Sequence, residues 1–556
     1  MKKLLFAGII FTAIFLRFWQ LGSNPPSLTW DEVTWGYNAY SLGIDGRDEF
    51  GRFLPLDYLE SFGDFKPPVY AYLAIIPVKL FGLNEFAVRF PSAFFGVLTV
   101  LATYFLVKTL FHLRGVHLAT SEELKTENIA LLSAFLLAIS PWHIMLSRAA
   151  FEANVATFFI VLGVFLFLIA IRNNRWVLLI SVISFVLSIY TFNTARVVAP
   201  VLILVLAFAF RKELLKQKKE TLIVIILGLI FLLPVARFLT FPQASLRFKE
   251  VNIFSDTGVI GNANKQIEND NNAFWSKIIH NRRFVYGVSY LKHYFDNLNP
   301  GFLFIKGDGN PKFSTQTVGQ MYLWELPFFV LGILYLIRKK EGYWWIVPMW
   351  LLVGIIPAGT ARETPHALRI ETTLPTFQIL TAYGLYQILV GLKTYDSRLK
   401  NFMKGRLFVI FCLTSSILLL INFLYFFHGY LVHYPRIYSG EWQYGYRESI
   451  DFVKEKQNQY EKIEVTTALG RPYVYYLFYT KKDPHEFRKQ AIVEREVFGF
   501  VNVRGFDKFR FMKKLEEEGG RNILYINTPS EVPKNARILR TFYLLNGNLS
   551  LVAYSL

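Results

Sequence analysis

The side chains best suited to chemistry lie in a few short segments between long apolar runs. Asp31 and Glu32 stand together where a stretch of helical spacing begins, and a carboxylate there can act as a general base. Thr29 and Glu32 also fit a capping box, in which each side chain satisfies a free N–H at a helix start. This structural role explains Glu32 better than Asp31, for which only the general preference for acids near a helix N-terminus applies.

A second segment carries an acid and a base before two prolines. Asp64 and Lys66 precede Pro67 and Pro68, whose rings stiffen the backbone. The same residues can also form a plain turn into a surface helix over 69–82. That turn requires neither charge, so both interpretations stay open.

Two further segments offer cations. Arg148 and Glu152 are four residues apart, so they can either pair on one helix face or serve a ligand. The short loop 359–369 contains Arg362, His366 and Arg369. Arginine forks suit phosphate oxygens, although these side chains can also reach out to lipid headgroups.

The elements that must position these residues are membrane helices. The chain has 556 residues, 53% of them hydrophobic, with a mean hydropathy of +0.32. The apolar residues form runs that can cross about 30 Å of hydrocarbon. We expect about eleven spans. They cover 4–20, 84–111, 128–146, 151–171, 176–192, 197–210, 221–240, 321–338, 343–358, 370–392 and 407–428.

The first apolar run resembles a signal peptide because Lys2 and Lys3 precede it. No small-residue cleavage site follows, and Arg17, Phe18 and Trp19 are typical of an interfacial anchor. We therefore expect an uncleaved span.

Basic residues gather in alternate connections between the spans. These are Lys2/Lys3, Arg114, Arg172/Arg175, 211–219, 338–340 and 393–406. The positive-inside rule places them, and the N-terminus, in the cytoplasm. The segments 21–83, 241–320, 359–369 and 429–556 then lie outside. A net charge of +19 would suggest nucleic acid in a soluble protein, but here anionic lipid accounts for it, so we expect a cytoplasmic-membrane protein without a nucleic-acid partner.

The chain is expected to divide at residue 428. Residues 1–428 form an α-helical polytopic membrane domain, with a surface helix from Thr29 that stops near Gly43. Residues 429–556 form an extracytoplasmic α/β domain with strands at 462–467, 473–479, 522–527 and 541–544, and helices near 484–490 and 506–518. This domain suits acceptor binding or a lid better than catalysis.

Cofactor signals are few. The one cysteine, Cys412, excludes an intramolecular disulfide and argues against a thiolate metal site. No segment resembles a nucleotide-binding loop, so no nucleotide cofactor is expected. A divalent ion can assist a phosphate leaving group, but oxygen-ligand sites cannot be recognised from spacing.

Several motifs together resemble a known family. Their order is Asp31-Glu32, then Gly46–Leu56, Phe65–Pro68, Leu83–Ser92 and Pro365–Arg369. They are similar to the bacterial and archaeal members of the protein O-mannosyltransferase-like family, within the GT-C glycosyltransferase superfamily. That group is related to the enzyme that transfers aminoarabinose to lipid A. The resemblance covers residues 1 to about 428 and the opening of the tail.

The resemblance implies an enzyme that transfers a sugar, mannose or another hexose or pentose, from a polyprenyl-monophosphate carrier, with inversion. Asp31 would be the catalytic base with Glu32 as its neighbour, Lys66 would contact the donor phosphate, and Arg89 would support the site. One departure concerns metal binding. The aminoarabinose enzyme has an acid directly before Lys-Pro-Pro, whereas this chain has Phe65 there and Asp64 one place earlier. A metal site at Asp64 and Glu152 is therefore the weakest of these expectations.

Elementary chemistry agrees with this division of roles. A hydroxyl acceptor needs a base, and the departing phosphate needs cations already in place, for which Lys66, Arg148, His366 and Arg369 are candidates. The acceptor can be a protein, a lipid or a glycan. A transporter and a non-catalytic scaffold remain alternatives. The sequence shows no strong internal repeat and few charges in the middle of spans, which disfavours transport.

Overall fold

The computed structural model describes residues 1–111, 120–172, 175–396, 405–495, 501–515 and 522–556. Arg114 and most of the basic segment 393–406 lie outside these ranges. The chain divides into two compact units. The first unit comprises residues 1–17, 95–146 and 152–427, and the second comprises residues 18–94, 147–151 and 428–556. The functional division expected at residue 428 remains a prediction.

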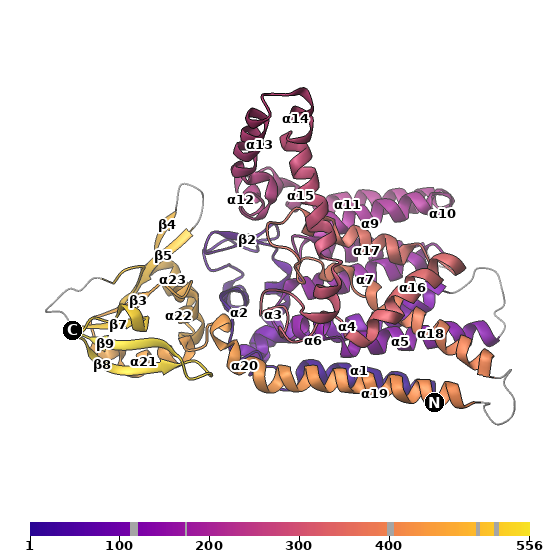
Figure 1. Ribbon diagram of the computed structural model, residues 1–556. Helices are drawn as coiled ribbons and strands as arrows, with labels where there is room; N and C mark the ends of the chain where they lie inside the picture. The colour runs from indigo at the N-terminus through magenta and orange to yellow at the C-terminus, as the bar shows by residue number, and fades with distance from the viewer. Residues whose placement is uncertain (112–119, 173–174, 397–404, 496–500, 516–521) are drawn as a thin grey trace. The chain divides into compact units, whose positions relative to one another are not determined.

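The first unit is built from helices, labelled in Figure 1. Those that lie wholly or partly in it are α1 (Lys2–Phe18), α4 (Glu85–Phe111), α5 (Thr120–Ile139), α6 (Pro141–Arg148), α7 (Glu152–Ala170), α8 (Val177–Ile189), α9 (Ala195–Ala209), α10 (Arg211–Leu215), α11 (Lys218–Leu239), α12 (Pro242–Val251), α13 (Thr257–Asn269), α14 (Phe274–Ile279), α15 (Arg282–Asp296), α16 (Leu326–Lys339), α17 (Ile346–Gly359), α18 (Thr376–Asp396) and α19 (Arg406–His428). Every predicted span therefore overlaps a helix.

Four described helical stretches are each long and apolar enough to cross a membrane. They are α4, α7, α11 and the stretch 406–437 that begins with α19. The pair α5 and α6 would form a fifth if taken as one bent span. Helices such as α8, α9 and α17 are apolar but shorter. The fold class is confirmed, whereas the number of spans stays a prediction.

One expectation about the first unit is refined and one is wrong. The predicted span 128–146 corresponds to α5 and α6, which are bent by 55° at a break after Ile139. Pro141 follows the break and has no N–H with which to continue the ladder. The expectation that Arg17 is an interfacial anchor is wrong. Its side chain is buried and donates to the carbonyl of Ala138 (3.0 Å) and approaches His143 Nδ1 (2.6 Å).

The second unit joins the first predicted outer loop to the C-terminal residues. Its helices are α2 (Trp30–Asp45), α3 (Val69–Phe81), α20 (Tyr434–Ile437), α21 (Tyr446–Lys456), α22 (Pro472–Thr480) and α23 (Pro484–Gln490), beside the start of α4 and the ends of α6 and α19. Its strands are β1 (Leu59–Ser61), β2 (Asp64–Lys66), β3 (Lys462–Thr466), β4 (Ile492–Arg495), β5 (Val501–Phe506), β6 (Phe509–Met512), β7 (Ile523–Asn527), β8 (Arg537–Tyr543) and β9 (Leu549–Ser555).

Helix α2, predicted as a surface helix, starts as predicted but ends later, and most of its residues are buried. The Thr29 side chain accepts from the N–H of Glu32, and the Glu32 carboxylate accepts from the N–H of Thr29 at 2.9 Å, so the capping box is confirmed. The helix continues past Gly43 and ends at Asp45, where Gly46 adopts a φ of +73°. Only glycine takes this left-handed cap without strain, so Gly46 is the stop signal.

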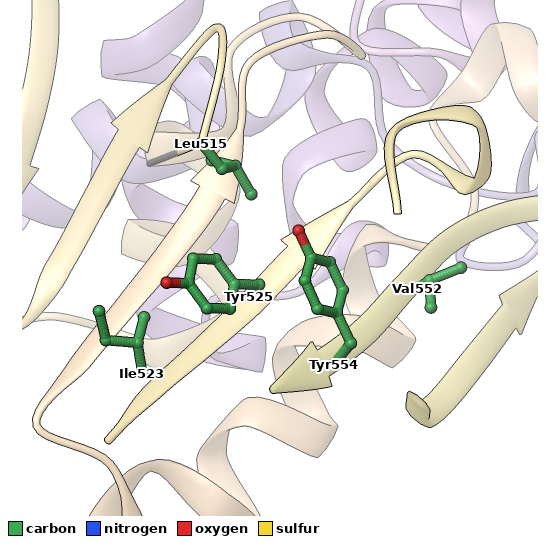
Figure 2. Close-up of a cluster of buried hydrophobic side chains, with 5 residues drawn as sticks. All are labelled: Leu515, Ile523, Tyr525, Val552 and Tyr554. Atoms are coloured by element: carbon green, nitrogen blue, oxygen red, sulfur yellow. The ribbon is translucent and has the colours of Figure 1, made fainter. Parts of the chain in front are cut away.

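The C-terminal residues form the expected α/β domain. The sheet order is β4-β5-β6-β3-β7-β9-β8, in which β3 runs parallel to both β6 and β7. A small core of five buried residues lies where β7 pairs with β9 (Figure 2). Within it the rings of Tyr525 and Tyr554 stack with centroids 5.1 Å apart.

Two elements of this domain were predicted wrongly. Residues 473–479 are not a strand, because they belong to helix α22, and almost all of them are buried. Residues 506–512 are not helical, because Phe506 ends β5 and the rest includes β6, with alternating burial along Phe509–Met512. The part of that predicted helix beyond Leu515 lies outside the described residues.

Candidate functional site

The two neighbouring acids at the start of α2 face different surroundings. Successive residues of a helix point about 100° apart, so Asp31 and Glu32 cannot face the same way. The Glu32 side chain is completely buried, whereas 47% of the Asp31 side chain is exposed. Only Asp31 is therefore accessible to an outside molecule.

Glu32 is held by contacts within the second unit. Its Oε1 accepts from Arg89 Nε at 2.9 Å and from the N–H of Ala150 at 2.9 Å, while its Oε2 accepts from the N–H of Thr29. The ion pair with Arg89 is fully buried on both sides. A carboxylate engaged in this way fixes the start of α2 and leaves little capacity for a substrate.

Arg89 and Arg148 both tie down the chain that leads into α2. Arg89 donates to the carbonyls of Leu21 (3.2 Å) and Pro25 (2.8 Å), and Arg148 donates to that of Asn24 (2.9 Å). The Arg148 guanidinium also lies 5.6 Å from the ring centre of Tyr430. The two arginines therefore donate hydrogen bonds to backbone carbonyls that would otherwise be buried without a partner.

Asp31 has a cation as its direct partner. Lys66 Nζ forms an ion pair with Asp31 Oδ1, and 7% of the Lys66 side chain is exposed. The ammonium lies 5.1 Å from the ring centre of Trp35 and 4.7 Å from that of Phe62. The aromatic rings hold the cation by cation–π attraction. The result is a positioned lysine beside a half-exposed carboxylate.

A buried acid behind Lys66 escaped the sequence analysis. Glu49 accepts from the Tyr473 hydroxyl at 3.2 Å and from the Asn38 amide at 3.4 Å. Burial, and then the neighbouring Asp48, raise the pKa of Glu49 to about 8. Glu49 is therefore largely protonated at neutral pH. Tyr473 also accepts from the N–H of Phe62 at 3.1 Å, which links the tail to the wall of the lysine site.

Asp48 stabilises the adjoining turn. Its Oδ1 accepts from the N–H groups of Phe50 (3.1 Å) and Arg52 (2.8 Å). Burial raises the pKa of Asp48 to about 6 despite these bonds, which lower it. The two adjacent acids between Gly46 and Gly51 were the available sequence signal for this cluster.

The tail is joined to the first outer loop by several polar contacts. Tyr475 donates to the carbonyl of Leu28 at 3.0 Å, just before α2. Arg495 pairs with Glu60 of the same loop at 2.6 Å, and Arg447 pairs at 3.0 Å with Glu85, which begins α4. These pairs connect residues far apart in sequence, so no local pattern predicts them.

The remaining predicted cations lie in the first unit. The N–H of His366 donates to Asn297 at 3.0 Å, and Arg362 donates to the carbonyl of Asn252 at 3.1 Å. Burial, and then Arg369, lower the pKa of His366 to about 3, so the imidazole is neutral at pH 7. Arg369 is half-buried and donates to the carbonyl of Glu363 at 3.4 Å. The loop is therefore fixed against the segment 252–297.

An acid that sequence reasoning missed fixes the same loop. Asp308 accepts from the N–H of Ala367 at 2.6 Å and from that of Asn310 at 2.8 Å. Burial raises the pKa of Asp308 to about 6. The carboxylate thus holds the loop between His366 and Arg369.

Arg148, Glu152 and Asp64 lie in different local structures from those expected. Arg148 and Glu152 do not share a helix face, because Arg148 ends α6 and Glu152 begins α7 after an intervening turn. Asp64 lies in the two-stranded hairpin of β1 and β2. Within the described ranges no three His, Cys, Asp or Glu side chains gather as a metal would require.

Part of the chain matches a family model. Residues 65–238 match the model described as dolichyl-phosphate-mannose-protein mannosyltransferase. A protein of Aquifex aeolicus (strain VF5) is 29% identical over 223 residues, which are 39% of this chain and 40% of that protein. The match thus spans well under half of the relative's length.

Solved structures share the fold. ArnT from Cupriavidus metallidurans in the apo state matches with a TM-score of 0.55 at 12% identity. The match covers 99% of this chain and 97% of the ArnT chain. The same protein bound to undecaprenyl phosphate has a TM-score of 0.52. An oligosaccharyltransferase of Archaeoglobus fulgidus, tethered with an acceptor peptide, matches with a TM-score of 0.50 at 14% identity. That match covers 86% of this chain and 63% of the oligosaccharyltransferase chain. Residues 65–238 are thus similar to the mannosyltransferase family model, and the chain as a whole shares the fold of these solved structures.

Proposed function

We propose that this protein is a membrane glycosyltransferase that moves a sugar from a polyprenyl-phosphate carrier to a hydroxyl acceptor. The observation that carries the proposal is the ion pair between half-exposed Asp31 and Lys66, whose ammonium lies over the rings of Trp35 and Phe62. The fold shared with a protein solved with undecaprenyl phosphate supports the choice of donor.

The proposed reaction is a single displacement. The acceptor oxygen attacks the anomeric carbon of the sugar, and its proton passes to the Asp31 carboxylate. The bond between the anomeric carbon and the phosphate oxygen breaks, and polyprenyl phosphate leaves with its electron pair. One displacement inverts the anomeric configuration and needs no covalent intermediate. Glu32 takes no part, because its oxygens are bound to Arg89 and to backbone N–H groups.

Lys66 changes partner in this scheme. Without donor its ammonium binds Asp31. A donor phosphate offers a stronger anionic partner, so the ammonium turns to it and the Asp31 carboxylate becomes available to the acceptor. The base is thus released only when the donor is bound, which limits loss of the activated sugar to water.

The other cations receive more limited roles. Arg369 and Arg362 are proposed to assist the donor phosphate as charged groups, and His366 only as a neutral hydrogen-bonding group, because its pKa is about 3. Arg148 is proposed to act at a distance, since its observed bonds go to backbone carbonyls. A divalent ion at Asp64 and Glu152 remains a prediction that chelator treatment would test.

The proposed location follows from charge. Basic connections orient the N-terminus toward the cytoplasm, so Asp31 and the C-terminal domain would face the outer side. The sugar would be mannose or another hexose or pentose, and the acceptor would be a protein, a lipid or a glycan of the cell envelope.

The experiment uses purified full-length protein in proteoliposomes. A radiolabelled polyprenyl-phosphate sugar and a labelled nucleotide sugar are offered separately with cell-envelope acceptor. We expect label to move from the lipid donor only, and the transfer to fall by about 10- to 100-fold with Lys66→Gln. Transfer from the nucleotide sugar, or no transfer while a reference transferase works in the same membranes, would overturn the proposal.

A further inference from the structure

A pocket of about 330 Å³ opens in the C-terminal domain. It lies where strands β3 and β6 end. These strands are parallel and neighbouring, and the N–H of Thr467, just after β3, donates to the carbonyl of Met512 at the end of β6. In the sheet, β3 lies between β6 on one side and β7 on the other. Ligands commonly bind at the carboxyl ends of such parallel strands.

The charged side chains that line the pocket are all cations. They are Arg471, Arg504 and Lys513, and no acidic side chain is among the described lining residues. Arg471 donates to the Asn502 side chain at 3.3 Å, which holds its guanidinium at the rim. Arg504 pairs with Glu494, but both partners are about half exposed, so this pair exchanges readily for a ligand.

The pocket adjoins the candidate catalytic residues within the second unit. Gly470 lines it with a φ of +119°, and a Cβ there would lie 2.8 Å from the ring of Trp30, the residue before Asp31. The Arg471 guanidinium lies 5.2 Å from the ring centre of Phe62, the ring that also contacts Lys66. Tyr473, which binds Glu49, lines the pocket too.

We propose that this pocket binds an anionic group, a phosphate or carboxylate, carried by the acceptor substrate. This inference rests on the proposed transferase function. In the proposed reaction Lys66 supplies the donor phosphate with a cation, whereas the three further cations that line this pocket suit an anion on the other substrate. The pocket would hold the acceptor by its charge while a hydroxyl of the same molecule reaches Asp31.

The first test measures anion binding directly. Inorganic phosphate is titrated into detergent-solubilised full-length protein that carries Lys66→Gln, and ³¹P line broadening is recorded. Adding Arg471→Gln and Lys513→Gln should weaken phosphate binding by about tenfold or more, as expected for lost charge-assisted bonds. Lys514→Gln is the matched control, because Lys514 is adjacent and exposed but does not line the pocket. Equal broadening in all variants would overturn the pocket assignment.

The second test separates the pocket from the transferase proposal. In the transfer assay, Arg471→Gln should raise the acceptor KM by about tenfold and leave the donor KM unchanged. A raised donor KM instead would mean that the pocket serves the lipid phosphate, which contradicts the inference. Phosphatase treatment of the acceptor should raise its KM if the anion is a phosphate, and not if it is a carboxylate. If wild type transfers no sugar, the transferase proposal fails, and the acceptor assignment fails with it even where phosphate binding is observed.

Discussion

The substitution Glu32→Gln separates a structural acid from its catalytic neighbour. Glutamine keeps an oxygen that can accept the Thr29 N–H, so the helix cap is largely retained. It removes the negative charge that faces Arg89, whose guanidinium is fully buried and bonded to carbonyls of the preceding chain. An unpaired buried cation results.

The expected cost follows from that burial. Breaking a buried ion pair by removing one partner costs about 3–5 kcal/mol. Loss of a helix cap alone costs about 1 kcal/mol, so the ion pair dominates the effect. The double variant Glu32→Gln, Arg89→Met removes the orphaned charge and should recover part of the loss.

The assay is thermal unfolding of the detergent-solubilised protein, followed by tryptophan fluorescence at one fixed scan rate. Unfolding of such a protein is commonly irreversible, so the midpoints are compared as operational values. We expect Glu32→Gln to lower the midpoint by several degrees and Asp31→Asn to leave it nearly unchanged. Equal midpoints for Glu32→Gln and wild type would refute the structural role of Glu32.

Three further predictions concern the groups around Lys66. The pKa of Glu49 is about 8 in the folded protein against an ordinary value of 4.5, so the folded state binds the proton more tightly than the unfolded state. This proton binding stabilises the folded protein at low pH, and the stabilisation is lost as pH rises from about 4.5 to 8. Glu49→Gln, which stays neutral, should therefore gain stability relative to wild type as the pH of a melting series is raised, and a constant difference would contradict this. Lys66→Gln should reduce kcat/KM for the donor by about 10- to 100-fold, measured in the transfer assay, because a charge-assisted bond is worth about 1.5–3 kcal/mol. Tyr473→Phe removes the hydroxyl that donates to Glu49 and accepts from the N–H of Phe62, so it should lower the free energy of unfolding by about 1–3 kcal/mol in a melting experiment. Tyr476→Phe is the control and should be neutral, because the Tyr476 hydroxyl has no hydrogen-bond partner among the described residues.

Local patterns predicted the start of α2 well. The capping box depends on residues three apart, and both of its hydrogen bonds are present. The end of the helix was misjudged because Gly43 was taken as the stop, whereas Gly46 has the left-handed backbone of a cap. A glycine inside a helix and a glycine that ends one look alike in sequence.

Helix α22 shows where periodicity fails. Its residues Tyr473–Tyr479 are aromatic or branched and almost all buried, so they show no polar face. Such a run has the composition of a strand, and only Pro472 at the first helical position indicated a helix. The error hid Tyr473, and with it the bond to Glu49.

The candidate site itself was only partly predictable. The family resemblance suggested Asp31 and Lys66, which form an ion pair. Sequence spacing could not show that Glu32 forms an ion pair with Arg89, 57 residues away, because that pair depends on tertiary packing. The contacts of the tail with the first outer loop are non-local for the same reason.

The most direct test of the account compares sugar transfer by Asp31→Asn and by wild type at equal folded fraction. Asparagine preserves shape and removes the base, so we expect the rate to fall by at least about 10²-fold with the donor still bound. Transfer by Asp31→Asn at the wild-type rate would mean that Asp31 only starts a helix, and would contradict the mechanism.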